Sequence, residues 1–147
     1  MVYATADDLL EYMDEERVQA AVVLSVARQE SGSDVAQTEE VLKVCSEHPG
    51  RLIPFCAVDP EDSMALKKVE GYAEMGFRGF GEHKVKLRVD DPRSKEIYGV
   101  CGGLGFPVLL HMEDAYNPDI EGYERILAEF PDTVFIAHGP GWWKEIS

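Results

Sequence analysis

Two short apolar runs that each end in a histidine constrain the fold more than any other feature of this sequence. Residues 106–111 read FPVLLH and residues 133–138 read TVFIAH. Apolar runs without polar alternation are typical of strands buried on both faces, as in a parallel sheet covered by helices. The helical pattern between the two runs supplies the crossover that parallel neighbours need. We therefore predict two adjacent parallel strands in an α/β protein.

The histidines that close these strands are His111 and His138. The carboxyl ends of parallel strands are where α/β proteins place their chemistry. A single histidine at a strand end is usually a hydrogen-bonded structural residue, but two at matched positions indicate ligands of one metal ion. We expect both rings to hold or orient the ion and its water, which gives His138 a catalytic role as well.

A third candidate segment, residues 81–84 with the sequence GEHK, ends the preceding predicted strand. Glu82 could bind the metal and take part in catalysis, and Lys84 could hold an anionic group of a substrate. Side chains alternate in an extended strand, so only one of Glu82 and His83 should point inward. His83 is the candidate for a further substrate contact. The alternative is an exposed Glu–Lys pair beside a capping histidine.

Glu113, two residues after His111, is the last candidate. Its carboxylate could contact a substrate, orient a ligand or act as a general base. The alternative is a solvated loop acid like its neighbour Asp114, because acids in loops are usually exposed. Both interpretations remain open from the sequence.

The balance of charge and cysteine limits the possible partners. The chain has 28 Asp+Glu against 14 Lys+Arg, a net charge of −14, which argues against nucleic acid and against an anionic membrane. No apolar run approaches the roughly 20 residues of a spanning helix, and the N-terminus lacks the pattern of a signal peptide. Three cysteines without a CxxC pair indicate reduced thiols in a cytoplasmic protein. Histidine and carboxylate are left as the metal ligands.

The chain as a whole alternates helix and strand patterns five times. Asp59, Asp91 and Asn117 each precede a proline and are predicted to cap a helix, as is Thr5 near the N-terminus. The predicted helices cover residues 7–17, 37–47, 59–75, 91–104 and 117–127, and the predicted strands residues 20–26, 52–58, 77–83, 106–111 and 133–138.

Five such units fit two architectures. One is a complete, open, doubly wound sheet, and the other is a partial (β/α)8 barrel, since a closed barrel needs about 250 residues and this chain has 147. The barrel is favoured because the chain opens on a helix and ends near two adjacent tryptophans that would otherwise have little to pack against. We predict a single partial barrel domain over residues 1–147 with five parallel strands and outer helices.

Six segments in this order resemble the amidohydrolase-related family of metal-dependent hydrolases. They are residues 75–80 (MGFRGF), 90–92 (DDP), 97–98 (IY), 104–111 (LGFPVLLH), 130–132 (FPD) and 136–139 (IAHG). The resemblance implies a (β/α)8 barrel with one or two metal ions, often zinc. Members hydrolyse amides, esters or lactones, and some relatives decarboxylate aromatic acids.

Through the resemblance, His111 matches the family's histidine on the fifth strand and His138 the one on the sixth. Glu82 and His83 lie where the fourth strand contributes a ligand or a substrate contact. The family's His-x-His pair on the first strand and its aspartate on the eighth have no counterpart here. The resemblance thus implies an internal part of such a barrel.

The function expected from these observations is a metal-dependent hydrolase that uses a divalent ion, zinc, to activate water and cleave an amide, ester or lactone. One alternative is a metal-dependent decarboxylase on the same barrel. Another is a catalytically incompetent α/β fragment that associates through its open sheet edges. The expected partners are a small-molecule substrate and further copies of the chain, with neither nucleic acid nor a membrane.

Overall fold

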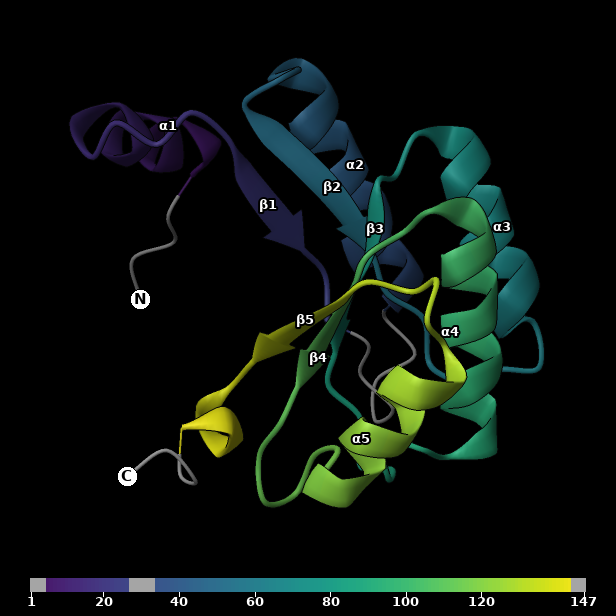
Figure 1. Cartoon of the computed structure of the whole chain (residues 1–147). Coiled ribbons are helices and arrows are strands. Elements are labelled where there is room, and N and C mark those ends of the chain that lie inside the picture. The colour runs from purple at the N-terminus through teal and green to yellow at the C-terminus, as the bar shows by residue number, and fades with distance from the viewer. Residues whose placement is uncertain (1–4, 27–33, 144–147) are drawn as a thin grey trace.

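Five parallel strands form a curled sheet that makes up half of a barrel (Figure 1). This computed structural model describes residues 5–26 and 34–143. Each strand pairs with its neighbour along the chain, in the order β1-β2-β3-β4-β5. Sequential order is that of a (β/α)8 barrel, whereas a doubly wound sheet reverses its order at a switch point. The partial barrel is therefore confirmed, with strands β1 (Ala21–Leu24), β2 (Leu52–Cys56), β3 (Gly79–His83), β4 (Val108–His111) and β5 (Phe135–His138).

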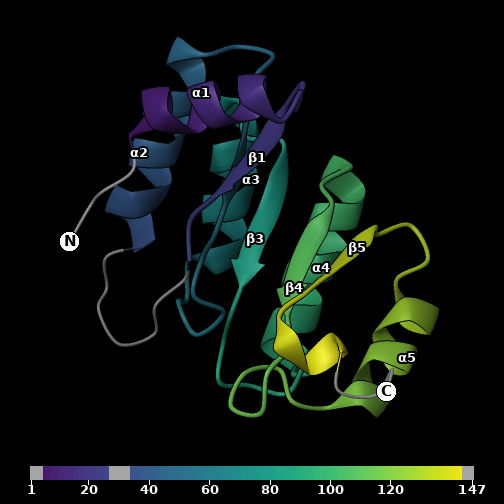
Figure 2. The same cartoon turned by 90° about the vertical axis from the view of Figure 1, so that its left-hand side faces the viewer.

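The helices alternate with the strands, and α3 and α4 lie together on the outer side of the sheet (Figures 1 and 2). In the described ranges, no helix has the length and apolar character needed to cross a bilayer. The helices are α1 (Ala6–Glu15), α2 (Asp34–Glu47), α3 (Ala65–Met75), α4 (Pro92–Leu104) and α5 (Ile120–Glu129), followed by the 3-10 turn η1 (Pro140–Trp142).

The main hydrophobic core lies between the sheet and these outer helices. Val108 and Leu110 of β4 belong to it, together with Tyr98 of α4, and all three are buried. Because side chains alternate along a strand, the intervening positions face the inner, concave side of the curl. Val22 of β1 and Ile136 of β5 are 42% and 37% exposed. The concave face is thus less covered than the outer one.

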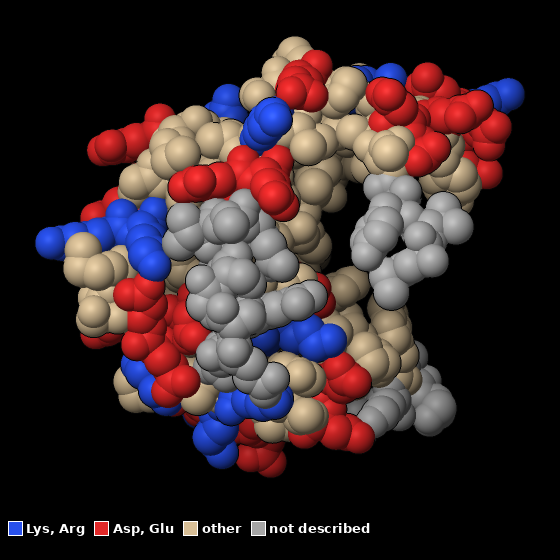
Figure 3. All heavy atoms as spheres, turned by 180° about the vertical axis from the view of Figure 1, so that it is seen from behind, with Lys and Arg blue, Asp and Glu red and all other residues tan. Residues whose placement is uncertain are grey.

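Charged side chains are spread over the surface rather than gathered by sign. On the face in Figure 3, Lys and Arg are scattered among Asp and Glu. One group joins the loop after β3 to α5: Arg88 and Arg125 each pair with both Asp90 and Asp119. Exposed pairs of this kind contribute little to stability. They do neutralise the basic residues locally, so this group offers no uniform basic surface.

Several predicted helix ends are confirmed. Thr5 and Asp8 form a capping box at the start of α1, and Asp91 caps α4 by accepting from the backbone two residues on. Gly76 and Gly105 end α3 and α4 with φ angles of 113° and 70°. Such left-handed conformations favour glycine because it has no Cβ.

The predicted start of the third helix is wrong by several residues. The α-helix begins at Ala65, not after Asp59. The Asp59 carboxylate accepts from the Glu61 N–H, and the Asp62 carboxylate accepts from the Met64 N–H. Two successive turns closed by aspartate side chains thus precede the helix, because such side chains compete with helical hydrogen bonds.

The predicted cap of the fifth helix is also wrong. The N-terminal flanking residue of α5 is Asp119, and the helix begins at Ile120. Asn117 instead adopts a φ of 47° and is fully buried. Its side-chain amide donates to the carbonyl oxygens of His83 and His111, at the ends of β3 and β4, instead of capping the helix.

The pairing between β3 and β4 is irregular at Gly81. Phe80 lies opposite Val108 but His83 lies opposite Leu110, so β3 holds one residue more than β4 over this stretch. A Cβ on Gly81 would lie 2.8 Å from the Cβ of Leu109. Only glycine allows the two backbones to approach this closely. The extra residue breaks the alternation of side chains just before the predicted site.

His83 lies on the core side of this irregular strand and is fully buried. Its Nε2 is 3.1 Å from the hydroxyl oxygen of Ser94 in α4. The rings of Phe80 and Tyr98 have centroids 5.6 and 5.7 Å from the imidazole. Loss of hydration lowers the pKa of His83 from 6.5 to about 4. The imidazole is thus a neutral core residue at physiological pH.

We predict that His83 makes the protein less stable as the pH falls from about 6.5 to about 4. Between these values the unfolded chain binds a proton at this residue and the folded protein does not, which lowers the free energy of unfolding by up to about 1.4 kcal/mol per pH unit. In His83→Gln this part of the slope should vanish, whereas His48→Gln should keep it. Urea unfolding across this pH range measures the slope, and identical slopes in wild type and His83→Gln would contradict the prediction.

Candidate metal centre

Three side chains that can bind a metal meet at the carboxyl ends of β3, β4 and β5. They are Glu82, His111 and His138, and one ligand atom from each lies within 4.8 Å of the other two. His111 and His138 are register partners at the last positions of their strands. The irregularity at Gly81 brings Glu82 to the same side, because the extra residue changes which face the side chain takes. We refer to these three residues as the triad.

The contacts within the triad are short. Nδ1 of His111 lies 2.5 Å from Oε1 of Glu82, and Nε2 of His138 lies 3.5 Å from the same oxygen. The two imidazole centroids are 5.5 Å apart. Ligands bound tetrahedrally to one ion at about 2.1 Å are about 3.4 Å from one another. The contact between His138 and Glu82 has this spacing, whereas His111 and Glu82 lie closer together than two ligands of one ion would.

The hydrogen bonds of His111 show that the triad suits a metal ion. Its Nδ1 is buried and has no hydrogen-bond partner, although it lies beside the Glu82 carboxylate. Its Nε2 is hydrogen-bonded to Oε2 of Glu113 at 3.0 Å. A buried nitrogen without a partner is rare in proteins. This Nδ1 lies beside the same Glu82 oxygen that His138 approaches, so a divalent cation shared by the triad would supply its partner.

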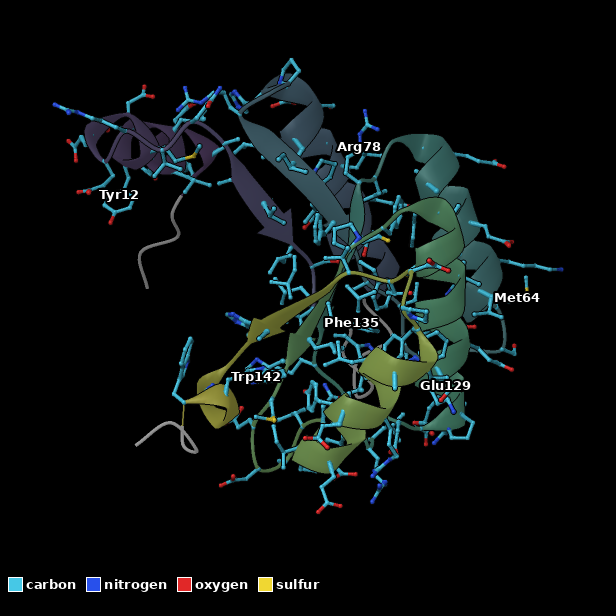
Figure 4. The ribbon with its side chains drawn as sticks, viewed as in Figure 1. Tyr12, Met64, Arg78, Glu129, Phe135 and Trp142 are labelled. Carbon is cyan, nitrogen blue, oxygen red and sulfur yellow. The ribbon has the colours of Figure 1, made fainter. Side chains whose placement is uncertain are left out.

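Burial differs between the three side chains. The side chains of His111 and Glu82 are 7% and 14% exposed, whereas that of His138 is 51% exposed. His138 lies on β5, and the chain then turns into η1, which carries Trp142 (Figure 4). The Trp142 ring packs against Tyr123 of α5 with ring centroids 4.3 Å apart. A ligand would thus approach the triad from the side of His138.

The predicted residues Lys84 and Glu113 lie next to the triad. Nζ of Lys84 is 3.5 Å from Oε2 of Glu113, the oxygen that also contacts His111. The hydrogen bond from His111, followed by the charge of Lys84, lowers the pKa of Glu113. Nζ of Lys84 also lies 4.9 Å from the centre of the Tyr116 ring, whose centroid is 6.2 Å from that of His111. Lys84, Glu113 and Tyr116 therefore form one side of the site.

His83 does not join this group. Its ring packs on α4 in the core, on the other side of the strand from the triad. A direct substrate contact through His83 is therefore not expected, because the side chain is fully buried. The sequence left open which of Glu82 and His83 faces the site. In the structure Glu82 lies with His111 and His138, and His83 lies in the core.

Two glycines after β5 allow close packing on the end of β4: Gly139 makes room for His111 and Met112, and Gly141 makes room for Met112. A Cβ on Gly139 would lie 3.1 Å from Nδ1 of His111 and 2.8 Å from the carbonyl oxygen of Met112, and a Cβ on Gly141 would lie 2.7 Å from the same oxygen. The Gly141 N–H donates to that carbonyl at 2.8 Å. The turn after β5 thus packs directly on the residue after β4. Neither glycine was identified from the sequence as part of the site.

Comparisons with known proteins bear on the family and the fold of the chain. The family model described as Amidohydrolase matches residues 1–147, while no curated protein matches the chain significantly. Three similar solved structures are an uncharacterised TIM-barrel protein from Bordetella bronchiseptica (TM-score 0.67, 21% identity, 90% of this chain and 50% of that one), 2,6-dihydroxybenzoate decarboxylase from Rhizobium (0.65, 16%, 91% and 55%) and 5-carboxyvanillate decarboxylase from Novosphingobium aromaticivorans with bound manganese (0.69, 14%, 88% and 48%).

At these identities the structural likeness shows the fold, which is that of a TIM barrel. The chain spans about half the length of the structures it matches. The family match extends over all the residues that contribute to the triad and to its surroundings. The chain therefore belongs to the amidohydrolase family.

Proposed function

We propose that this chain forms the metal-binding part of a hydrolase that cleaves an amide, ester or lactone. The observation that carries the proposal is the convergence of the triad, with the partnerless Nδ1 of His111 facing Glu82 and His138. Membership of the amidohydrolase family supports a hydrolytic reaction. Two imidazoles and a carboxylate are ligands that suit zinc, and we propose zinc as the resident ion.

The three side chains would have different tasks. Glu82 and His111 would hold the ion from the buried side, and His138 from the exposed side. When bound, a divalent ion supplies a Lewis acid for a substrate carbonyl and lowers the pKa of water. His138 is exposed enough to contact a substrate, and it would orient the attacking water or accept its proton. Glu82, whose carboxylate lies 3.5 Å from His138, is the second group that could accept this proton.

Lys84 and Glu113 are proposed to contact the substrate. Lys84 is 31% exposed and its ammonium group lies beside the carboxylate that contacts His111. A compact cation at this place would hold an anionic group of a small-molecule substrate. Glu113, which already accepts from His111, would orient that imidazole and could accept a hydrogen bond from the substrate.

A decarboxylase is the second candidate function. Two of the three solved structures described above are decarboxylases, one of 2,6-dihydroxybenzoate and one of 5-carboxyvanillate, and the second contains manganese. The triad and Lys84 could serve that reaction equally, because a metal and a cation both bind a substrate carboxylate. A third candidate is a non-catalytic module in which β1 and β5, the edge strands of the described sheet, pair with another copy. A monomer in light scattering would contradict this third candidate.

The test is metal analysis followed by activity assays. The protein is loaded with Zn²⁺ or Mn²⁺ and incubated with a panel of aryl esters, amides and lactones, and separately with hydroxybenzoates. Metal-dependent hydrolysis supports the proposal, and release of CO₂ without hydrolysis favours the decarboxylase. A protein that binds neither ion would contradict both functions.

We predict that His111→Ala and Glu82→Gln each weaken Zn²⁺ binding by more than about 100-fold. Loss of an outer hydrogen-bond partner already weakens metal binding by about 10–100-fold, and loss of a ligand should do more. Isothermal titration or competition with a chelator measures the affinity. His48→Ala, which removes a partly buried histidine next to the end of α2, is the matched control and should bind like wild type. Wild-type affinity in His111→Ala would remove this residue from the site.

We further predict that Gly139→Ala weakens Zn²⁺ binding by about tenfold. The added methyl group would press on the His111 ring and on the Met112 carbonyl, and the φ of 96° is unfavourable for alanine. Gly103→Ala is the control, since nothing lies within 4 Å of the added atom, and in helix α4 alanine should stabilise the protein slightly. If both variants bind Zn²⁺ like wild type, the space beside His111 does not matter for the metal.

A further inference from the structure

The side chain of Asn117 joins the two strands that carry the buried half of the triad. Its Nδ2 donates to the carbonyl oxygen of His83, at the end of β3, and to that of His111, at the end of β4, both at 2.8 Å. An amide NH₂ group has two donors, and both are used here. Since both neighbours are carbonyl oxygens, the nitrogen end of the amide must face them.

This bridge lies beside the interruption in the pairing of β3 and β4. The register between β3 and β4 shifts between Phe80 and His83, so regular ladder pairing is interrupted just before the strands end. The amide of Asn117 then connects His83 and His111 beyond the interruption. His83 follows the ligand Glu82 directly, and His111 is itself a ligand. The bridge therefore limits how far Glu82 and His111 can separate.

Asn117 is itself held in place. It is fully buried, and its own N–H donates to the carbonyl oxygen of Val85 at 3.1 Å. Its φ of 47° is in the left-handed region, which asparagine tolerates better than most residues. The loop before it is closed by reciprocal backbone hydrogen bonds between Glu113 and Tyr116, each of 3.0 Å. The amide is thus presented to the strand ends by an ordered loop.

We infer that Asn117 is a positioning residue for the metal site, which sets the separation of Glu82 and His111 through the carbonyl groups of the two strand ends. The inference rests on the proposed function in taking the triad as metal ligands. A bridge between strand ends could also serve stability alone, and the experiment must separate these roles.

The test compares Asn117→Asp and Asn117→Gly with a control that loses a buried hydrogen bond elsewhere. Aspartate keeps the shape but turns an oxygen toward two carbonyl oxygens, and glycine keeps the backbone conformation but has no amide. The control is Thr133→Val, because the buried hydroxyl of Thr133 donates to the Tyr98 carbonyl at 3.0 Å, just before β5 and away from the triad. Thermal stability, Zn²⁺ affinity and the imidazole NMR signals of the metal-free protein are measured for each.

We expect all three variants to lose thermal stability, but only the Asn117 variants to shift the His111 signals and to bind Zn²⁺ about tenfold or more weakly. If Asn117→Asp does not fold, Asn117→Gly carries the comparison. Unchanged His111 signals with wild-type Zn²⁺ affinity in a folded Asn117 variant would overturn the inference. Shifted His111 signals in a protein that binds no metal even as wild type would sustain the positioning role while the proposed function fails.

Discussion

The register between β4 and β5 is the constraint on which the site depends. It places His111 directly opposite His138, so the two imidazoles leave the sheet side by side. Side chains alternate with a period of two, and a slip of one residue would turn one ring toward the helices. In β4 the apolar residues before the histidine prevent the slip, since Val108 and Leu110 must stay in the core. In β5 it is Phe135 that packs against this core. Burial of the strand thus also orients the ligand.

Glu82, the third member of the triad, depends on an irregular register and not on a regular one. Regular pairing of β3 would send alternate side chains to opposite faces, but one extra residue around Gly81 lets Glu82 reach the concave side while His83 enters the core. The close approach to Leu109 is possible because Gly81 has no side chain. A break in the ladder is tolerable here because other groups tie the strand ends: Glu82 donates its N–H to the carbonyl of Ser25 beyond β1.

Environment gives the histidines of this sheet different chemistry. His83 is enclosed by aromatic rings, and burial lowers its pKa to about 4, so it acts as a neutral core residue. His111 lies between two carboxylates, one hydrogen-bonded to Nε2 and one beside a partnerless Nδ1. His138 is half exposed and open to a ligand. Position in the barrel decides which imidazole can bind a metal.

Much of this protein could be read from the sequence. Two apolar runs that stop at histidine predicted adjacent parallel strands and a paired site, because burial and strand period are local properties of the chain. The starts of α1 and α4 followed from the capping residues Thr5 and Asp91 for the same reason. Tertiary structure alone decided that Glu82 and not His83 faces the site, since that choice depends on an irregular register with a neighbouring strand. It also decided that Asn117 bridges two strand ends instead of capping a helix, because both carbonyl groups come from segments distant in sequence. Local patterns determine which elements form, whereas contacts between elements determine which atoms meet.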